Sequence, residues 1–160
     1  MDQKAADQLP PASLELERLG IPHRVFRHAG VTTSLEQAAR ERGQRPEQVV
    51  RSILFRLGQD DFVMVLASGG AQIPWKKLRQ QVSQNRLTLA TAEEVVQITG
   101  YAIGTVSPFG MRQHVRILID RRVLTKQQIS IGSGLANTGI VMSSQDLLRA
   151  LPEGEILDLI

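Results

Sequence analysis

The segment Gly100-Tyr-Ala-Ile-Gly-Thr-Val-Ser-Pro-Phe-Gly110 contains three glycines, a proline and two aromatic residues in close succession. It follows a run typical of a helix, from Ala92 to Thr99, so Gly100 suits the left-handed residue that ends a helix. Pro108 fixes its own φ and favours an extended conformation at Ser107. The segment therefore predicts a stiff loop whose backbone N–H groups and Ser107 hydroxyl can bind a ligand.

The same segment also fits a purely structural role. Gly and Pro mark turns in many proteins, and a strand is predicted shortly afterwards, from Val115 to Ile119. In this alternative the segment only joins a helix to a strand, and Tyr101 and Phe109 pack into the core. The residue pattern alone leaves both interpretations open.

The composition indicates one globular domain. The chain has 160 residues, of which 42% are hydrophobic and 22% are charged. This length allows a substantial core without disulfides. Because the chain has no cysteine, a thiol nucleophile and a thiolate metal site are excluded. We expect a soluble protein of the reducing cytoplasm.

The charge and the chain ends add little functional information. The net charge is +3, and because the three acids Glu153, Glu155 and Asp158 all follow Pro152, the part before them carries +6. This modest basic excess is compatible with phosphate contacts. Residues 1–11 lack the apolar core of a secretory signal, and no apolar run approaches the ~20 residues that span a bilayer. We expect no membrane association.

Strand and helix patterns alternate irregularly along the chain, which predicts a mixed α/β fold with a twisted or partly closed mixed sheet surrounded by helices. Residues 1–11 are predicted to be a disordered leader, residues 12–152 a single domain, and residues 153–160 an acidic and apolar tail. Helices are predicted over 14–19, 35–41, 73–79, 92–99 and from 144 toward Pro152. Strands are predicted over 23–27, 50–57, 62–67, 86–90, 115–119, 129–131 and 140–142.

Side-chain caps support several of these helices. Ser13 is predicted to cap the first helix, and Thr33-Ser-Leu-Glu36 and Thr91-Ala-Glu-Glu94 fit capping boxes. Arg40, Arg42 and Arg45 gather at the end of the second helix. The simplest interpretation of this basic cluster is a solvated face, and the alternative is contact with RNA.

The loop at residues 100–110 resembles the Gly-x-x-x-Pro loop of the YbaK-like, prolyl-tRNA-synthetase-associated aminoacyl-tRNA deacylase domains. Gly104 and Pro108 occupy its two fixed positions. Further segments similar to that family follow in the same order, so the resemblance covers roughly residues 13 to 150. It implies a mixed α/β fold and an aminoacyl-tRNA deacylase activity.

The predicted hairpin formed by residues 50–57 and 62–67 contains the main departure from that family. Alternation places Arg51, Ile53, Phe55 and Leu57 on one face. The resemblance implies a catalytic lysine just inside this strand, where this chain has Arg51. As an alternative, Arg51 is a strand residue that reaches water or pairs with a carboxylate such as Glu47.

The resemblance assigns further residues to the site. Thr32 and Thr33 lie where the family often has a hydroxyl residue near the pocket mouth, although Thr33 also fits simple helix capping. Gly134 lies in a glycine-rich turn that faces the pocket in the family, and Ser107 belongs to the loop itself. The implied substrate-binding residues are Thr32, Thr33, Gly104, Ser107, Pro108 and Gly134, with Arg51 as the catalytic residue.

Other chemistry is poorly supported. His23, His28 and His114 are too scattered for a metal motif, and Ser107 lacks the glycines of a nucleophile elbow. Gly132-x-Gly134 has Asn137 where a dinucleotide fingerprint needs its third glycine. Trp75 fits either an anchor in the core or a stacking platform for a base. We expect neither a metal nor a cofactor.

These expectations lead to one preferred function and two alternatives. The resemblance implies a free-standing trans-editing deacylase that removes a mischarged small amino acid from tRNA, with an aminoacyl-tRNA synthetase as a further candidate partner. The first alternative is a non-catalytic module that binds aminoacyl-tRNA or a synthetase. The second is a pocket for another small ligand. The sequence gives neither the amino acid nor the oligomeric state.

Overall fold

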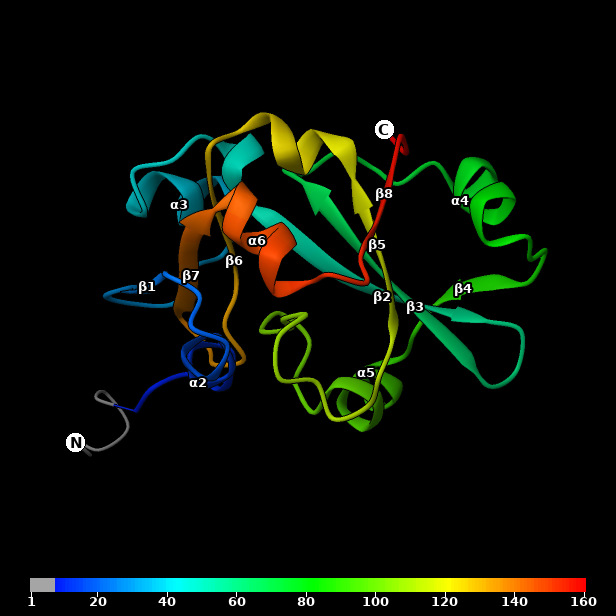
Figure 1. The fold of residues 1–160 in the computed structure, drawn as a ribbon, viewed down its shortest axis with the longest axis horizontal. Helices are drawn as coiled ribbons and strands as arrows, with labels where there is room; N and C mark the ends of the chain where they lie inside the picture. The colour runs from blue at the N-terminus through cyan, green and yellow to red at the C-terminus, as the bar shows by residue number, and fades with distance from the viewer. Residues whose placement is uncertain (1–7) are drawn as a thin grey trace.

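The computed structural model describes residues 8–160, and these residues form two β-sheets with helices around them (Figure 1). The mixed α/β fold and the partly closed sheet arrangement agree with the sequence prediction. The helices are α2 (Pro11–Arg18), α3 (Leu35–Glu41), α4 (Trp75–Val82), α5 (Ala92–Thr99) and α6 (Ser144–Ala150), with short 3₁₀ turns η1 (Pro46–Gln48) and η2 (Arg121–Thr125).

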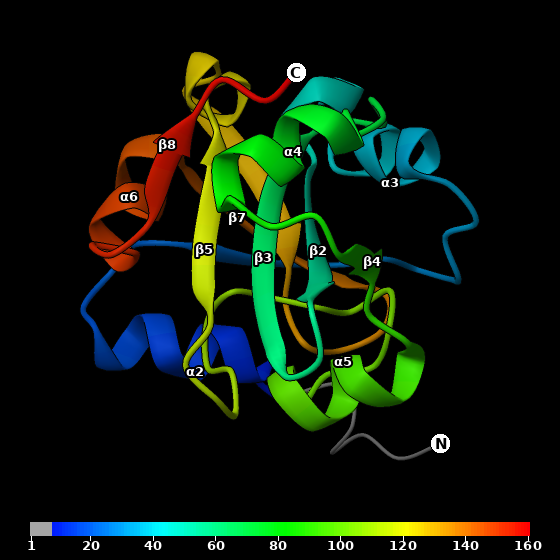
Figure 2. The same cartoon turned by 90° about the vertical axis from the view of Figure 1, so that its right-hand side faces the viewer.

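The smaller sheet has three antiparallel strands in the order β1-β7-β6, namely β1 (Arg24–Arg27), β7 (Thr138–Ser143) and β6 (Gln128–Gly132). The larger sheet has the order β4-β2-β3-β5-β8. Its strands are β4 (Leu87–Leu89), β2 (Val50–Leu57), β3 (Asp61–Ser68), β5 (Arg116–Asp120) and β8 (Glu155–Leu157). β2 and β3 form the predicted antiparallel hairpin, and β5 lies parallel to β3 in the interior of the sheet (Figure 2).

Both faces of the β2–β3 hairpin are buried. Val50 and Leu54 belong to one apolar cluster, which also contains the inward residues of the smaller sheet. Phe55 and Leu57 belong to a second cluster on the other face, together with Leu78 of α4. Because successive strand residues point to opposite faces, the hairpin needs this nearly continuous apolar sequence.

The two sheets meet through an isolated bridge between Val49 and Ser130. Val49 stands directly before β2, and Ser130 lies in the middle of β6. The bridge brings the start of β2 beside β6, although about 80 residues of sequence separate them. This junction between the sheets holds the candidate site described below.

The N-terminal helix starts earlier than predicted. α2 begins at Pro11 with Pro10 as its N-cap, and Ser13 does not cap it. Proline suits this first position because its missing N–H has no partner within a helix. Ser13 is instead buried, and its hydroxyl lies 2.6 Å from Nε2 of His23. Of the predicted leader, residues 1–7 lie outside the described residues, and Pro11 is already helical.

The predicted C-terminal tail contributes to the larger sheet. β8 pairs in parallel with β5, and Leu159 is buried. The Asp120 carboxylate accepts hydrogen bonds from the backbone N–H groups of Leu159 and Ile160, at 2.9 and 3.2 Å. Residues 153–160 are therefore tied to the domain by a strand and by one buried carboxylate.

The caps near the site follow the predicted pattern, with one shift. Thr91 and Glu94 form the expected capping box, and Gly100 ends α5 with φ 82°. α3 has the predicted bounds, but its N-cap is Ser34, whose hydroxyl accepts from the N–H of Gln37. The N-cap predicted at Thr33 thus lies one residue later, and the Gln37 side chain accepts from the N–H of Thr33.

Candidate functional site

A pocket of about 300 Å³ opens at the junction of the two sheets. Its wall is formed by the end of α3, the start of β2, the loop after α5, the end of β6 and the first residue of β7. The lining residues are Arg42, Val49, Val50, Arg51, Ser52, Ile53, Gly104, Val106, Ile131, Gly132 and Thr138.

The charges of the pocket have one sign. Among these described lining residues Arg42 and Arg51 are cations, and none is Asp or Glu. Half-buried cations are stabilised by anions or by hydrogen-bond acceptors. The pocket therefore favours a ligand that brings negative charge, or one that develops it during a reaction.

Arg51 is oriented by backbone carbonyls. Its Nε donates to the carbonyl oxygen of Gly69 at 2.5 Å, and its Nη2 donates to that of Ala71. None of the ion pairs formed within residues 8–160 includes Arg51, so the alternative pairing with Glu47 is not formed. Burial lowers the pKa of the Arg51 guanidinium. Because both acceptors are neutral, Arg51 keeps its charge for the pocket.

Ser52 adds a polar group beside Arg51. Its Oγ is buried and has no hydrogen-bond partner within residues 8–160. An unpartnered buried hydroxyl costs about 1–3 kcal/mol. A ligand that exchanged a hydrogen bond with Ser52 would recover part of this cost.

Arg42 is the feature of the pocket that the sequence interpretation missed. It was expected in a solvated basic face, but the structure shows it half-buried against β6 and β7. It follows the buried Ala38 and Ala39 by four and three residues, so it lies on the same face of α3 as they do. That spacing was the available signal. Burial lowers the pKa of the Arg42 guanidinium, and the nearby charge of Glu41 opposes this change.

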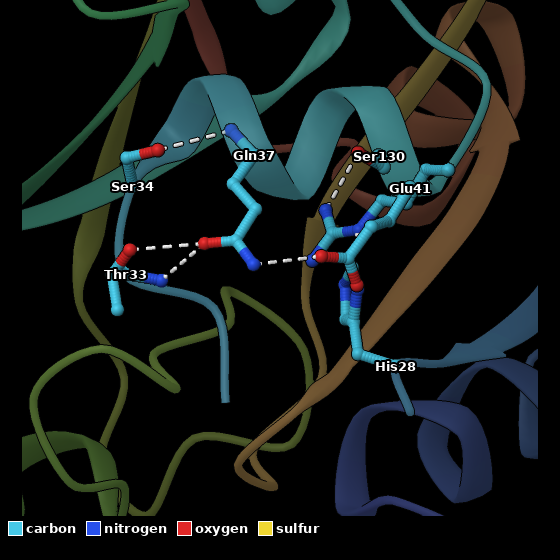
Figure 3. A network of polar contacts seen from close by, with 7 residues as sticks. His28, Thr33, Ser34, Gln37, Glu41 and Ser130 are labelled. Carbon is cyan, nitrogen blue, oxygen red and sulfur yellow. Dashed lines mark hydrogen bonds and ion pairs between the residues drawn. The ribbon is translucent and has the colours of Figure 1, made fainter. Parts of the chain in front are cut away.

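A chain of polar contacts runs from the loop before α3 to this arginine (Figure 3). The backbone N–H and the hydroxyl of Thr33 donate to Oε1 of Gln37, whose Nε2 donates to Glu41 at 2.9 Å. Glu41 in turn contacts Nδ1 of His28, also at 2.9 Å. Thr33 is thus exposed and hydrogen-bonded to Gln37, and Thr32 lies half-buried in the same loop outside the pocket lining.

The loop at residues 100–110 is held closed by its own side chains. Tyr101 and Phe109 are buried, as one of the two sequence interpretations predicted, and the Tyr101 hydroxyl donates to the carbonyl of Phe109 at 2.5 Å. Burial, and then the charge of Glu15, raise the pKa of Tyr101 to about 12. Gly104 has φ 90°, and a Cβ there would meet open space. It therefore exposes backbone at the pocket.

Gly132 makes a close backbone contact that the sequence analysis did not predict. A Cβ at this position would lie 2.1 Å from the carbonyl oxygen of Val106. The N–H of Gly134 donates to the carbonyl of Thr105 at 2.8 Å. These contacts press the loop against β6 and shape the pocket wall between Gly104 and Gly132.

The other expected site residues lie away from the pocket lining. Ser107 is fully buried, and its hydroxyl accepts from the N–H of Phe109, so it serves the turn. Pro108 is buried and faces a different cavity. Gly134 has φ 93°, and a Cβ there would lie 2.8 Å from the ring of Tyr101. Arg51 and Gly104 are the expected residues that do line the pocket.

A larger cavity of about 630 Å³ lies between the start of β5 and residues 150–155. Two pairs of side chains meet in its lining: His114 contacts Glu153 at 2.7 Å, and Arg116 contacts Glu155 at 2.6 Å, while Arg112 is a further cation there. Because this lining contains two carboxylates, the smaller pocket, with two arginines and no carboxylate, is the better candidate for an anionic ligand.

Neither Trp75 nor the metal-binding residue types form a second candidate site within the described residues. The Trp75 ring packs edge-on against Phe55, with ring centroids 5.2 Å apart, and 37% of the residue is exposed, so it is only partly an anchor of α4. Within residues 8–160 no group of three or more His, Cys, Asp or Glu side chains is arranged to hold a metal ion. In the same part of the chain no helix has the length and apolar character needed to span a membrane.

Comparison with known proteins identifies relatives of this domain. The family described as aminoacyl-tRNA editing domain matches residues 28–150. A proline–tRNA ligase of Kosmotoga olearia is 38% identical over 87 residues, which are 54% of this chain and 15% of the ligase. The uncharacterized protein YwhH of Bacillus subtilis is 28% identical over 116 residues, which are 72% of this chain and 73% of YwhH.

A solved structure extends this similarity to nearly the whole chain. It is that of a candidate trans-editing enzyme for prolyl tRNA synthetase, and it is 27% identical with a TM-score of 0.86. The match covers 96% of this chain and 98% of the other. The chain thus corresponds to a small part of the ligase and to almost all of the chain in this solved structure.

Proposed function

Because this chain belongs to the aminoacyl-tRNA editing domain family, we propose that it is a trans-editing deacylase that hydrolyses the ester between a mischarged small amino acid and tRNA. The observation that carries this proposal is the pocket at the sheet junction, which combines two arginines with exposed backbone at Gly104. The likeness to a candidate trans-editing enzyme for prolyl tRNA synthetase supports action in trans. With such a substrate we expect the protein to act in the cytoplasm.

Hydrolysis of this ester needs positioning and charge stabilisation more than a nucleophilic side chain. Water attacks the ester carbonyl carbon, the carbonyl oxygen gains negative charge, and the bond to the ribose oxygen then breaks. The ribose oxygen takes up a proton, and the amino acid leaves as a carboxylate. A preorganised donor near the developing charge is worth ~10²–10³ in rate.

In this proposal Arg51 supplies the positive charge, and backbone N–H groups near Gly104 bind the carbonyl or the amino acid. Ser107, Pro108 and Gly134 shape the loop from behind, and Thr32 and Thr33 form the outer rim. Arginine keeps its proton at physiological pH, so Arg51 can stabilise charge but cannot act as a base.

Editing also has a physical purpose. A synthetase pocket separates amino acids that differ by one methylene by only about 1–3 kcal/mol, so a second hydrolytic site improves fidelity. A pocket of about 300 Å³ lies at the lower end of the range for small-molecule sites, which suits a ligand the size of one aminoacyl group.

A second function remains a specific alternative, namely a non-catalytic module that binds aminoacyl-tRNA or a synthetase. The observation that favours it is Arg51 itself, which stands where the resembling family has its lysine and is fixed by two carbonyl groups. Such a fixed cation suits binding at least as well as turnover.

A binding experiment tests whether tRNA is the partner at all. Charged and uncharged tRNA are titrated into the protein at about 50 mM and about 200 mM salt, and affinity is expected to fall steeply at the higher value. Exposed cations such as Lys76, Lys77 and Arg112 are available for phosphate contacts, whereas Arg116 is paired with Glu155. Absence of binding at low salt would refute both tRNA functions and leave a pocket for another small ligand.

A further inference from the structure

Arg42 is a cation of the pocket whose guanidinium is fixed by neighbouring residues but does not use all of its hydrogen-bond donors. Its Nε donates to Nε2 of His28 at 3.0 Å, and its Nη1 donates to Oγ of Ser130 at 2.8 Å. Its Nη2 makes no hydrogen bond within residues 8–160. The guanidinium lies flat against Gly139, where an added Cβ would come within 2.6 Å of Cζ. Three elements thus fix the plane of this side chain and leave one nitrogen available.

The hydrogen bond from Arg42 is compatible with only one protonation state of His28. Arg42 can only donate, so Nε2 of His28 must accept, and the imidazole is therefore neutral with its hydrogen on Nδ1. That hydrogen is donated to Oε1 of Glu41 at 2.9 Å. The hydrogen bonds from His28 and then Gln37 hold the pKa of Glu41 below its usual value, so Glu41 remains a carboxylate and keeps the ring in this orientation (Figure 3).

The charge of Arg42 is not neutralised by these contacts. Both of its acceptors, the His28 nitrogen and the Ser130 hydroxyl, are uncharged, and Glu41 is near enough for its charge to act on Arg42 but forms no ion pair with it within residues 8–160. A half-buried guanidinium is costly unless an anion comes close. Because the pocket lining holds Arg51 and no carboxylate, the anion must come with the ligand.

We propose that Arg42 and Arg51 together bind a phosphate group, and that neutral His28 is the positioning residue that aims Arg42 at it. Resting on the proposed function, the phosphate is the diester that joins the last two nucleotides of tRNA, since this group is the anion next to the aminoacylated ribose. Two arginines on separate elements, α3 and β2, then fix the 3′ end while the ester lies near Gly104.

Protonation of His28 would undo this arrangement. A hydrogen on Nε2 removes the acceptor of Arg42 and places two cations in contact. The charged side chains that contact His28 are Glu41, the last residue of α3, and Arg42, its C-cap, and Arg40 lies near Glu41. The ring of Phe26 from β1 packs edge-on against the imidazole, with ring centroids 4.9 Å apart. Phosphate binding should therefore weaken in acid, where the phosphodiester itself stays charged.

The direct test is binding of the trinucleotide CCA, of adenosine and of inorganic phosphate to the whole protein. Arg42→Gln should weaken the trinucleotide about 10-fold or more and leave adenosine, which has no phosphate, unchanged. Arg40→Gln is the matched control, because Arg40 is an exposed arginine of the same helix outside the pocket, and it should bind the trinucleotide like wild type. Equal trinucleotide affinity for Arg42→Gln and wild type overturns the proposal, as does a wild type that binds neither the trinucleotide nor phosphate.

The inorganic ion distinguishes the source of the phosphate. Tighter binding of CCA than of inorganic phosphate supports the tRNA end as ligand. Binding of inorganic phosphate that depends on Arg42, without binding of CCA, overturns the assignment to tRNA. Because Arg42→Gln removes contacts between α3 and β6, thermal unfolding is measured for each variant.

His28→Gln supplies the second variant. The glutamine amide offers one donor and one acceptor, so it can replace the neutral imidazole between Glu41 and Arg42, and it does not titrate. Wild type should lose trinucleotide affinity about 10-fold or more on acidification, and folded His28→Gln should not. Identical pH profiles for the two proteins overturn the role of His28.

A deacylation assay distinguishes a failure of the phosphate site from a failure of the proposed function. If wild type releases no amino acid from any mischarged tRNA, but CCA binding still depends on Arg42, the function fails and the phosphate site stands. If wild type is active and Arg42→Gln keeps the same kcat and KM, the function stands and the phosphate site fails.

Discussion

The sharpest structural test is Gly132→Ala, because it adds one methyl group at the contact that shapes the pocket. The new Cβ would lie 2.1 Å from the carbonyl oxygen of Val106 and 3.2 Å from that of Thr105. Both neighbours are backbone atoms, so the loop must move by about 1 Å or more. Overpacking of this kind costs about 1–3 kcal/mol. The adjacent hydrogen bond from Gly134 to Thr105 contributes about 1 kcal/mol more when it is lost.

The expected total is a loss of about 2–4 kcal/mol in the free energy of unfolding, which lowers Tm by about 4–16 °C for a chain of this size. Thermal and urea unfolding measure it. Gly30→Ala is the matched control, since a Cβ there meets nothing within 4 Å and its φ is not positive, and it should stay within about 0.5 kcal/mol of wild type. If Gly132→Ala were as stable as Gly30→Ala, the close contact between loop and β6 would be refuted.

Three further predictions concern the loop and the C-terminus. Gly104→Val should leave a folded protein with impaired ligand binding, because a branched side chain at φ 90° is strained by about 1–2 kcal/mol and projects into the pocket mouth. Full activity in this variant would show that the site lies elsewhere. The pKa of Tyr101 is raised to about 12, so the stability that its burial contributes is complete below about pH 10. It is lost as the pH rises toward 12, by roughly 2–3 kcal/mol. Tyr101→Phe should lose less stability than wild type over that range in urea unfolding, and parallel pH profiles would contradict this. Asp120→Ala should cost about 2–4 kcal/mol and speed amide hydrogen exchange at Leu159 and Ile160, because their N–H groups lose the same buried acceptor; unchanged exchange would show that the carboxylate does not hold the C-terminus.

The structural features predicted correctly from the sequence are those that depend on residues close together along the chain. The capping box at Thr91 and the left-handed Gly100 depend on contacts within four residues, and the hairpin of β2 and β3 joins consecutive strands through a short turn. All three are present. Where two hydroxyl residues compete, as Thr33 and Ser34 do, the same rules left the cap uncertain by one position.

The parts that were missed depend on contacts across long stretches of sequence. Ser13 was expected as a helix cap, but its hydroxyl meets His23, and the final residues join the larger sheet through β5. A propensity pattern carries no information on such partners. For the same reason the sequence analysis noted Gly132 only as part of a turn, although it lies closer to the backbone of the 100–110 loop than Gly134 does.

The candidate site was predicted in part for the same reason. The resemblance pointed to Arg51 and Gly104, and both line the pocket, but it gave no indication of Arg42. The hydroxyl of Ser107 was expected to face a ligand, yet the N–H of Phe109 two residues later is its partner. A short polar side chain beside a proline turn often bonds to its own backbone, and this local competition overrode the expected role.

The role of Arg51 tests the central claim most directly. The measurement is release of amino acid from a panel of mischarged tRNAs, including alanine, cysteine and serine on tRNA for proline and on other tRNAs. Wild type, Arg51→Lys and Arg51→Ala are compared under multiple turnover, with folding of each checked by thermal unfolding.

We expect wild type to release at least one small amino acid with multiple turnovers. We also expect substantial activity in Arg51→Lys, which keeps the charge, and a loss of about 10²-fold or more in Arg51→Ala. Tight binding of charged tRNA with no release across the panel would contradict the enzyme and indicate the binding module. Equal rates for wild type and Arg51→Ala would show that the cation at this position takes no part in the reaction.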